Sequence, residues 1–533
     1  MKLKNVRLIH LMCVALFSFV FTACSSEPTD SGQVGQPEQG ESTTEKELRI
    51  SMLSEIVSLD VHGANDTYSS NMTSQIYETL LNHDEDLALT PGLAKSYEQI
   101  DETTWEFQLE KDVKFHDGTP FTAEAVKANF DRVLDPAVAS QRAFLFTMID
   151  EVEVIDDHTV RFHTEYPFAP LPSHLAHTGA AIMSPKMIAE DYEEMAKGKD
   201  PGFVINKQAI GTGMFKFDEW KRGESVRLVK NNDYWGEPAK VDSVFVRVVS
   251  EGGTRMAELQ TGDAHIIDPL SPNELVQIEA TDGIHSDSQE SVMIMYVGFN
   301  TQHEYLSNKN VRKAISLALD RNEVLKGIYD EVGIEARSPL APKVFGYDPS
   351  VASNEQNIEE AKQLLAQEGL ADGFDIVFHT SNEKERQDIA TYVQSALEPL
   401  NINVKIEVQE WASFLEFTAE GEQEMFVLSW ATVTGDADYG LYALFHSDNH
   451  GTTGNRTFTT DERLDEKLDQ ARKSTDSDER LALYKDIQNI IAEEAYIQPL
   501  VHQNYLVGIR DEVEGFWQHP TRRMMLGDVV INE

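Results

Sequence analysis

Residues 429–445 read SWATVTGDADYGLYALF, and we place the centre of the protein in this stretch. A short apolar run ends at Trp430, a Gly-Asp turn follows, and aromatic residues return at once. Asp436 and Asp438 therefore lie in a loop between a strand-like and a helix-like segment. A mostly apolar pocket with a few placed charges is typical of a small-molecule site, and an aspartate in it can accept a charge-assisted hydrogen bond from a ligand ammonium group. The alternative is a surface turn in which Gly435 provides the backbone conformation and the aspartates bond locally.

Aromatic residues near this loop are candidates for the walls of such a pocket. They are Trp411, Trp430, Tyr439 and Tyr442. Rings in such numbers are equally common in an ordinary hydrophobic core. Both roles therefore stay open for these four residues.

The first 23 residues have the pattern of a secretory signal. Three basic residues open the chain, an apolar run follows over residues 8–21, and two small residues precede Cys24. The run is too short for a membrane-spanning helix. Its Phe-Thr-Ala-Cys ending resembles a bacterial lipoprotein box, which implies cleavage before Cys24 and lipidation of the Cys24 thiol. The alternative is an ordinary signal peptide with a stray cysteine.

Cys13 and Cys24 are the only two cysteines, so cleavage would leave one thiol and no disulfide framework. The residues that follow Cys24, up to residue 46, are rich in Ser, Gly, Gln, Glu, Thr and Pro. Such a composition cannot bury enough apolar surface to fold. We therefore expect residues 24–47 to be a lipid-anchored, flexible tether.

The charge of the chain is strongly negative. The sequence has 91 acidic and 45 basic residues, which gives a formal net charge of −46. The signal-like segment holds three basic and no acidic residues, so residues 24–533 carry 42 basic against 91 acidic residues, a net charge of −49. This excess argues against nucleic-acid binding and against electrostatic docking on anionic lipid. It fits a surface that stays soluble outside the cell.

The periodicity of apolar residues changes along the chain. Alternation predicts strands near residues 48–52, 105–109 and 160–162. Thr122 before AEAVKANFDRVL predicts a capped amphipathic helix. From residue 300 onward, helical patterns alternate with strand patterns. The sequence predicts an α/β protein with mixed sheets, and its length is sufficient for two large lobes.

Five separated motifs identify a family. They are FHDGTPFTAEAVKANF (residues 115–130), IGTGMFKFDEW (210–220), NNDYWG (231–236), VRKAISLALDRNEVL (311–325) and the tryptophan-to-Gly-Asp loop (430–436). In this order and spacing the chain resembles the family 5 extracellular solute-binding proteins, the peptide- and nickel-type receptors of ABC importers. The resemblance covers residues 48–530. One departure is Glu110, where the family often has Lys or Arg.

This resemblance implies a bilobal, periplasmic-binding-protein-like fold, the Venus flytrap, with an extra subdomain in the larger lobe. The large lobe would comprise residues 48–299, the second lobe residues 300–498, and residues 499–533 would return to the large lobe. The resemblance also implies that the lobes close around the ligand by a hinge motion.

The resemblance also implies ligand-binding roles. Asp436 matches the aspartate with which peptide-binding members hold the α-ammonium group, and Asp438 is the competing choice. Arg142 lies in a Gln-Arg-Ala-Phe segment similar to the one where nickel-type members place a carboxylate-binding arginine. Arg386 and Arg456 are alternatives, although a solvated surface position fits each of them better.

The sequence holds no motif of a catalytic or cofactor site. A nucleophile elbow, a P-loop and an HExxH motif are all absent. The His-Asp pair at residues 116–117 is typical of a turn. His174 with His177 and His446 with His450 have spacings that metal ligands can use on a helix, but prolines precede the first pair and loop residues surround the second. We expect no cofactor and no bound metal.

The expected function is that of an extracytoplasmic, lipid-anchored and monomeric receptor on the cell membrane. It would capture short peptides and deliver them to the membrane subunits of an ABC permease, without catalysing a reaction. Glutathione is an alternative ligand, since VTGDADYGLY and HGTTGNRTF resemble segments of glutathione-type receptors. A nickel chelate is a second alternative, and a secreted peptide hydrolase is the alternative from a different class.

Overall fold

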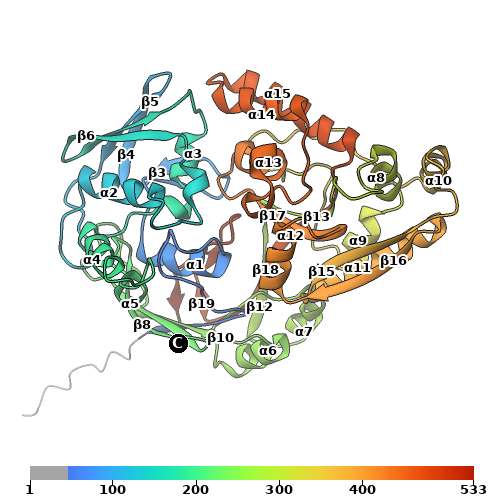
Figure 1. Ribbon diagram of the computed structural model, residues 1–533. Coiled ribbons are helices and arrows are strands. Elements are labelled where there is room, and N and C mark those ends of the chain that lie inside the picture. The colour runs from blue at the N-terminus through green and yellow to red at the C-terminus, as the bar shows by residue number, and fades with distance from the viewer. Residues whose placement is uncertain (1–45, 533) are drawn as a thin grey trace, which may run out of the picture. The chain divides into compact units, whose positions relative to one another are not determined.

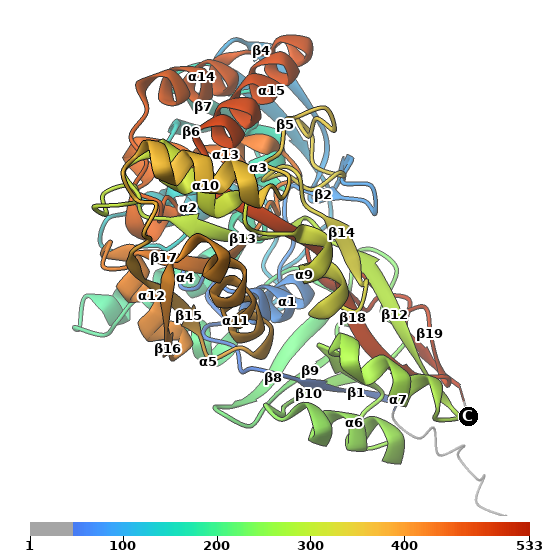
Figure 2. The ribbon, with the colours of Figure 1, turned by 90° about the vertical axis from the view of Figure 1, so that its right-hand side faces the viewer.

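Strand β18 links two halves of a 12-stranded sheet. It spans Ile497–Arg510; its first half pairs with β13 (Met293–Phe299) and β14 (Gly333–Glu335), and its second half pairs with β12 (Ile284–Glu290) and β11 (Ile266–Asp268). Figure 2 shows β18 running beside β12 and β14. The chain therefore passes between the halves at two adjacent places, at residues 291–292 and midway along β18.

The computed structural model describes residues 46–532, except for the side chain of Ala412. The signal-like segment, Cys24 and the tether up to residue 45 lie outside the described residues. Contacts group the described residues into one compact unit. Within residues 46–532, none of the helices has the length and apolar character needed to span a membrane.

The large sheet is mixed. Beyond β13 it continues with β17 (Met425–Ala431), β15 (Asp375–Ser381) and β16 (Asn403–Gln409), and beyond β11 with β1 (Glu47–Met52), β10 (Ser243–Val248), β9 (Ser225–Lys230) and β8 (Phe215–Lys221). β15 is parallel to both β16 and β17, and β1 is parallel to both β10 and β11. The other pairs in this sheet are antiparallel. The predicted α/β fold with mixed sheets is confirmed.

A separate four-stranded antiparallel sheet lies in the first half of the chain (Figure 1). Its order is β4 (Ala94–Asp101), β5 (Thr104–Leu109), β7 (Thr159–Thr164) and β6 (Ile149–Asp156), and α2 (Ala123–Leu134) packs against it. Phe107, Phe130 and Phe162 meet edge to face in its core, with ring centroids 4.9–5.4 Å apart. The predicted helix begins directly after Thr122, but the Thr122 hydroxyl makes no capping hydrogen bond.

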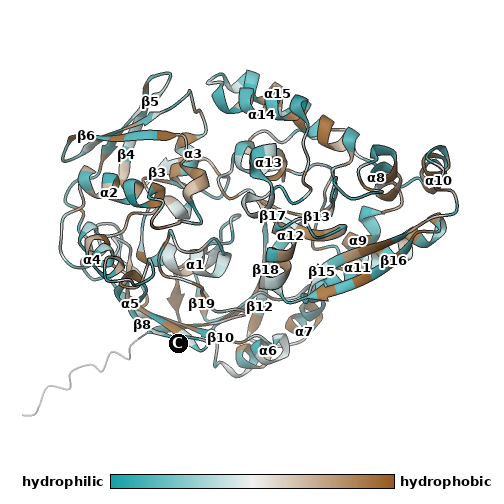
Figure 3. Ribbon diagram, viewed as in Figure 1, coloured by the Kyte–Doolittle hydropathy of each residue, from teal (hydrophilic) through white to brown (hydrophobic). Residues whose placement is uncertain are grey.

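Helices and strands alternate after residue 300, as the periodicity predicts. The helices are α8 (Lys309–Ser316), α9 (Arg321–Gly327), α10 (Ile358–Gln367), α11 (Lys384–Leu397), α12 (Trp411–Ala419), α13 (Ala437–Phe445), α14 (Glu462–Lys473) and α15 (Ser477–Glu494). α14 and α15 are largely hydrophilic in Figure 3. Their buried apolar residues, which include Leu464, Leu468 and Ile487, pack into one core cluster with residues of α13.

Shorter elements complete the described chain. They are α1 (Thr67–Ile76), β2 (Leu81–His83), β3 (Leu89–Pro91), η1 (Ala143–Leu145), α3 (Leu171–Leu175), η2 (Thr178–Ala180), α4 (Pro185–Met195), α5 (Ile205–Gln208), α6 (Gly252–Thr261), η3 (Pro272–Glu274), α7 (Leu275–Glu279), η4 (Glu398–Leu400), η5 (Ser447–Asn449), η6 (Gly451–Thr453), β19 (Val513–Glu514), β20 (Trp517–Gln518), β21 (Met524–Met525) and β22 (Val530–Ile531). The lobe boundaries at residues 299 and 498 stay a prediction.

Candidate functional site

The loop between β17 and α13 ends at Asp436, Asp438 lies in the first turn of α13, and both aspartates are buried. Asp436 is 4% exposed and Asp438 is 2% exposed. Asp436 is the N-cap of α13, where its side chain accepts a hydrogen bond of 2.9 Å from the Asp438 backbone N–H. Gly435 has a φ of 68°, which a residue with a side chain rarely adopts. The local bonding of a turn is therefore present, but the alternative of a surface turn is wrong because both carboxylates are buried.

Asp436 already has a cationic partner within the chain. Arg480 Nη2 lies 2.7 and 2.8 Å from the two carboxylate oxygens, and it also contacts the Tyr484 hydroxyl at 2.9 Å. Burial alone would lower the pKa of Arg480, but the charge and hydrogen bonds of Asp436 raise it above its ordinary value. The role of Asp436 toward a ligand ammonium group stays a prediction, and such a group would have to compete with Arg480.

Asp438 is surrounded differently. Its oxygens lie 3.0 Å from Arg472 Nε and 3.4 Å from His174 Nε2. Neither contact has hydrogen-bond geometry, so Asp438 Oδ1, Arg472 Nε and His174 Nε2 have no hydrogen-bond partner among the described residues. Burial raises the pKa of Asp438, but Arg472, His174 and Arg480 together outweigh this effect and the pKa is lowered. Asp438 is thus an ionised carboxylate with unused hydrogen-bonding capacity.

Arg142 is a buried cation without an acidic partner. It precedes η1 and is 4% exposed. Its nitrogens contact the Ala64 carbonyl at 2.8 Å, the Ser70 hydroxyl at 3.0 Å and His177 Nε2 at 3.2 Å. Among the described residues, no carboxylate lies within ion-pair distance of it. Burial lowers the pKa of Arg142.

A small cavity adjoins Arg142. It is too tight in this structure to admit a water molecule, and Ser69, Ser70, Thr73 and Thr178 supply hydroxyl groups to its wall. Asp60 also borders it, but Arg132 binds the Asp60 carboxylate at 2.7 Å. Hydroxyl groups and an uncompensated guanidinium form a wall that suits an anionic group.

Tyr439 connects the aspartate loop to Arg142. Its ring centroid lies 5.2 Å from that of Trp430, 5.7 Å from that of His177 and 6.1 Å from that of Phe144. Since His177 contacts Arg142, the structure brings Tyr439, Trp430 and Arg142 into one neighbourhood. His174, in the same segment as His177, reaches Asp438.

Two other predicted aromatic residues have different neighbours. The Tyr442 ring lies 3.7 Å from the Arg472 guanidinium and stacks on His446 at 4.4 Å, so it belongs to the side of the site around Asp438. The ring of Trp411 contacts Phe414 at 6.2 Å and the guanidinium of Arg386 at 4.3 Å. Among the described residues, the ring of Trp411 makes no ring contact with Tyr439 or Trp430 and no cation–ring contact with Arg142. Its place in a ligand site stays a prediction.

The expectation that Arg386 and Arg456 are solvated is wrong. Arg386 is 5% exposed and donates to the Ser381 and Ser429 hydroxyls. Arg456 is half-buried and donates to the Leu415 carbonyl and the Thr418 hydroxyl, each at 2.6 Å. Each guanidinium joins a loop or helix to its neighbours. A sequence pattern cannot distinguish an arginine with such internal partners from one on the surface.

The predicted turn at residues 116–117 is confirmed. Gly118 has a φ of 82° and its N–H donates to the Phe115 carbonyl at 2.8 Å.

The histidines at residues 446 and 450 have partners within the chain. His446 Nδ1 accepts from the Asp448 N–H, and His450 Nε2 lies 2.8 Å from the Thr459 carbonyl. Within residues 46–532, no group of three or more His, Cys, Asp or Glu side chains is arranged to hold a metal ion.

Sequence reasoning missed Arg523. It directly precedes the short strand β21, and its guanidinium is close enough to lower the pKa of both His83 and His177. Burial lowers the pKa of Arg523 to about 10. No carboxylate of the described residues pairs with it. The only signal in the sequence was a pair of arginines at residues 522–523 in a strongly acidic chain.

Comparison with known proteins decides the family. The model of the bacterial extracellular solute-binding proteins, family 5 middle region, matches residues 88–452. The chain belongs to this family. A curated relative, the glutathione-binding protein GsiB of Escherichia coli O1:K1, is 32% identical over 485 residues, which are 89% of this chain and 92% of that protein. The predicted resemblance is confirmed.

Solved structures of family 5 proteins agree with the fold. The periplasmic binding protein DppA from Helicobacter pylori, in complex with the peptide STSA, matches 91% of this chain and 98% of its own with a TM-score of 0.81 and 29% identity. The oligopeptide-binding protein AppA from Bacillus subtilis, in complex with a nonapeptide, matches 92% of this chain and all of its own (100%) with a TM-score of 0.80 and 25% identity. The predicted periplasmic-binding-protein-like fold is therefore confirmed.

Membership in the family fixes the general function. The chain is a family 5 substrate-binding protein of an ABC importer, and it acts outside the cytoplasm. Its relatives are binding proteins of transporters, not enzymes.

Proposed function

We propose that this family 5 protein captures a short peptide or peptide-like ligand with at least one free carboxylate and delivers it to an ABC permease. The observation that carries the proposal is Arg142, a buried guanidinium without an acidic partner among the described residues. Burying a charge without a counter-charge is costly. A ligand carboxylate that contacts Arg142 would supply that counter-charge.

Charge matching around α13 supports an anionic ligand. Asp436 is paired with Arg480, and Asp438 lies beside Arg472. Arg142 and Arg523 have no such partner among the described residues. Two guanidinium groups of this region therefore lack an ion-pair partner among the described residues, in a chain whose overall charge is strongly negative. A ligand with one or two carboxylates would restore the balance.

For a ligand ammonium group, the geometry favours Asp438 over Asp436. Both oxygens of Asp436 are engaged by Arg480, whereas Asp438 Oδ1 has no hydrogen-bond partner among the described residues. Tyr439 and Trp430 would provide apolar surface beside it. Asp436 would then have a structural role: it caps the N-terminus of α13 and ties it to Arg480.

Glutathione is the second candidate ligand. Two observations favour it: the 32% identity to a glutathione-binding protein over most of both chains, and the presence of two unpaired arginines in one region. Glutathione carries two carboxylates and one ammonium group, so it offers one counter-ion to each of Arg142, Arg523 and Asp438. A nickel chelate rests on the sequence resemblance alone.

Delivery requires that the permease distinguishes the loaded receptor from the empty one. We propose that residues 48–299 with 499–533 form one lobe and residues 300–498 the other, and that they close on the ligand about the junction of β12, β13 and β18. A ligand can shift this equilibrium only by as much as its affinities for the open and closed states differ. We further propose that the protein is a monomer and catalyses no reaction.

We also propose that Cys24 carries the lipid anchor. The support is the signal-like run before Cys24 and the polar composition after it, which cannot bury enough apolar surface to fold. Replacing Cys24→Ser should move the protein from the membrane fraction to the medium. If the variant still sediments with membranes, the anchor is not at Cys24.

A ligand panel tests the proposed function. Calorimetry would compare di- to pentapeptides, glutathione and a nickel–histidine complex, after refolding to remove any ligand carried through purification. We expect tight binding of a peptide or of glutathione, and loss of binding when the carboxylates are amidated. Tight binding of the nickel complex alone, or turnover of any peptide seen by mass spectrometry, would contradict the proposal.

A further inference from the structure

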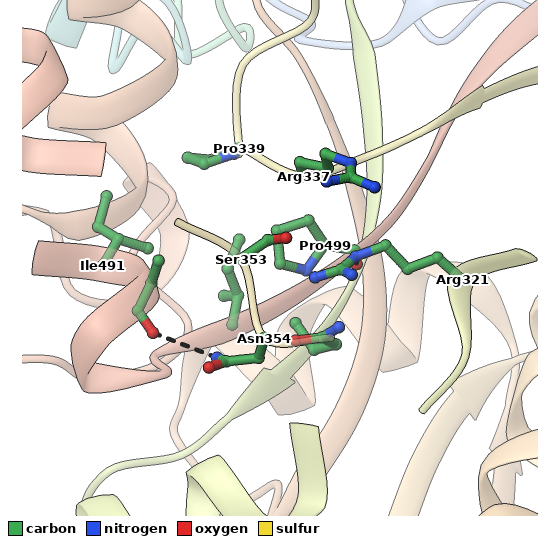
Figure 4. Close-up of a pocket in the computed structure, with 10 residues that line it drawn as sticks. Arg321, Arg337, Pro339, Ser353, Asn354, Ile491 and Pro499 are labelled. Carbon is green, nitrogen blue, oxygen red and sulfur yellow. Dashed lines mark hydrogen bonds between the residues drawn. The ribbon is translucent and has the colours of Figure 1, made fainter. Parts of the chain in front are cut away.

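A second pocket lies outside the region around α13. It is a small pocket that is partly open to solvent, and the polar side chains in its wall belong to Arg321, Arg337, Ser353, Asn354 and Gln498. Figure 4 shows Arg321, Arg337, Ser353 and Asn354 around Pro499 at the start of β18, near Ile491 of α15. None of these residues borders the cavity beside Arg142.

Arg321 is a buried cation that is only partly neutralised. Its side chain is 3% exposed, and its Nε donates to the Pro499 carbonyl at 3.1 Å. Its Nη1 lies 3.5 Å from Glu355, and its Nη2 has no partner among the described residues. In Figure 4 the guanidinium reaches beneath Pro499 toward the middle of the pocket.

Glu355 cannot neutralise this site alone. Its side chain is 59% exposed, and it also contacts Arg337 at 3.2 Å. One carboxylate that faces water is therefore shared between two guanidinium groups. Burial and the nearby Arg337 charge both lower the pKa of Arg321, while Glu355 acts in the opposite direction.

Gln498 adds a second set of unused polar atoms. It is fully buried (0% exposed), and neither the nitrogen nor the oxygen of its side-chain amide has a partner among the described residues. Its neighbours are already engaged, since Asn354 donates to the Ala492 carbonyl at 3.2 Å and Ser353 donates to Glu355 at 2.8 Å. A buried amide left without partners is destabilising, because it has lost its hydrogen bonds to water without replacing them.

We infer that this pocket binds a small planar oxyanion with a single negative charge, namely a carboxylate or hydrogencarbonate ion, separately from the transported ligand. The free Nη2 of Arg321 and the amide of Gln498 would donate to its oxygens, and a planar guanidinium matches a planar pair of oxygens. Glu355 at the rim disfavours a dianion such as hydrogenphosphate. A spherical chloride ion offers no planar pair of oxygens to the guanidinium, and hydrogencarbonate could in addition donate its hydroxyl to the amide oxygen of Gln498.

Thermal unfolding of the ligand-free, unmutated protein tests this inference. A bound anion stabilises the folded state by mass action, so acetate or hydrogencarbonate should raise the Tm more than chloride or phosphate at the same ionic strength and pH. Titration with ¹³C-labelled acetate and hydrogencarbonate, followed by NMR, would show which of the two sources fits better. Equal shifts with chloride, or no saturable binding at all, would mean that the pocket holds only water and would overturn the inference.

Two variants assign the effect to this pocket. Arg321→Gln should weaken anion binding at least tenfold. Gln498→Met keeps the size of the side chain and removes its unpaired polar atoms, so it should weaken anion binding yet raise the Tm in the absence of the anion. Arg463→Gln is the matched control, since it removes an exposed arginine elsewhere and should leave anion binding unchanged. If both pocket variants bind the anion as the unmutated protein does, the site lies elsewhere.

Discussion

Two aspartates that lie two residues apart have different electrostatic surroundings. Asp436 forms a two-oxygen contact with Arg480 and caps α13, while Asp438 faces Arg472 and His174 without aligned hydrogen bonds. The sequence identifies the loop that carries them, because the Gly-Asp turn and the aromatic residues are local signals. It does not identify which carboxylate is free, because Arg472 and Arg480 come from helices that begin more than twenty residues later.

A comparison of Asp438→Asn with Asp436→Asn tests this difference. If Asp438 contacts the ligand ammonium group, its replacement leaves a buried charge unpaired, which costs ~2–5 kcal/mol or roughly thirty- to several-thousand-fold in affinity. Calorimetry should show this loss with a free peptide and almost no further loss with its N-acetyl form. Asp436→Asn should instead lower the Tm, because it removes the partner of the buried Arg480. The reverse outcome, with ammonium recognition lost only in Asp436→Asn, would return the role to Asp436.

At the scale of elements, strand alternation and helical periodicity predict most bounds closely. Leu48, Ile50 and Met52 alternate into the core and define β1, and Trp105, Phe107 and Leu109 mark β5. The pairing of strands was harder to predict from the sequence. β18 changes partners between Gln503 and Asn504, inside a polar run at residues 502–504 that interrupts its apolar sequence, and such a run does not by itself predict a change of partner.

The buried histidine of β18 makes stability depend on pH. His502 is 3% exposed, and burial lowers its pKa to about 4 although its contact with the Met293 carbonyl opposes this. Its folded pKa is thus below the unfolded value of about 6.5. The unfolded chain takes up the proton first, so this contribution to stability is complete above about pH 6.5 and is lost as the pH falls toward 4.

Urea unfolding of His502→Gln at pH 7.5 and pH 5.0 would measure this effect. For one fully buried histidine, the linkage amounts to about 2 kcal/mol between these two pH values. The loss of unfolding free energy on acidification should therefore be smaller in the variant by about that amount. Because each protein is compared with itself at the two pH values, a general destabilisation by the substitution does not affect the result. An unchanged difference would show that His502 is protonated in the folded state at pH 5.0.

At the scale of the whole molecule, family membership follows from motifs spread over the chain, and the structure agrees with it. The chain is covered almost completely by solved family 5 structures. The ligand could not be predicted in the same way, because the polar groups around α13 come from residues 62–83, 142–144, 174–178, 472–480 and 519–523, which meet only in the fold. Arg523 shows this most clearly, since it is more than 80 residues from the aspartate loop.

Ligand-driven closure is a property of the whole molecule. If the two proposed lobes close on the ligand, saturating peptide or glutathione should reduce the radius of gyration in solution scattering. The same ligand should also raise the Tm. At a hundredfold excess over Kd it adds about 2.7 kcal/mol to the free energy of unfolding. Tight binding without any compaction would indicate that delivery to the permease does not depend on closure.

The central claim is that Arg142 receives a ligand carboxylate, and a two-by-two calorimetric cycle tests it most directly. Two proteins, the unmutated one and Arg142→Gln, are each titrated with two ligands, a peptide that binds and the C-terminal amide of that peptide. If glutathione is the ligand, each of its carboxylates is amidated in turn. We expect each single change to weaken binding by ~2–5 kcal/mol, and the double change to add almost nothing, because both remove the same contact. Circular dichroism and Tm would confirm that the variant is folded. If the losses from the substitution and from amidation simply add, Arg142 does not meet the carboxylate and the claim is wrong.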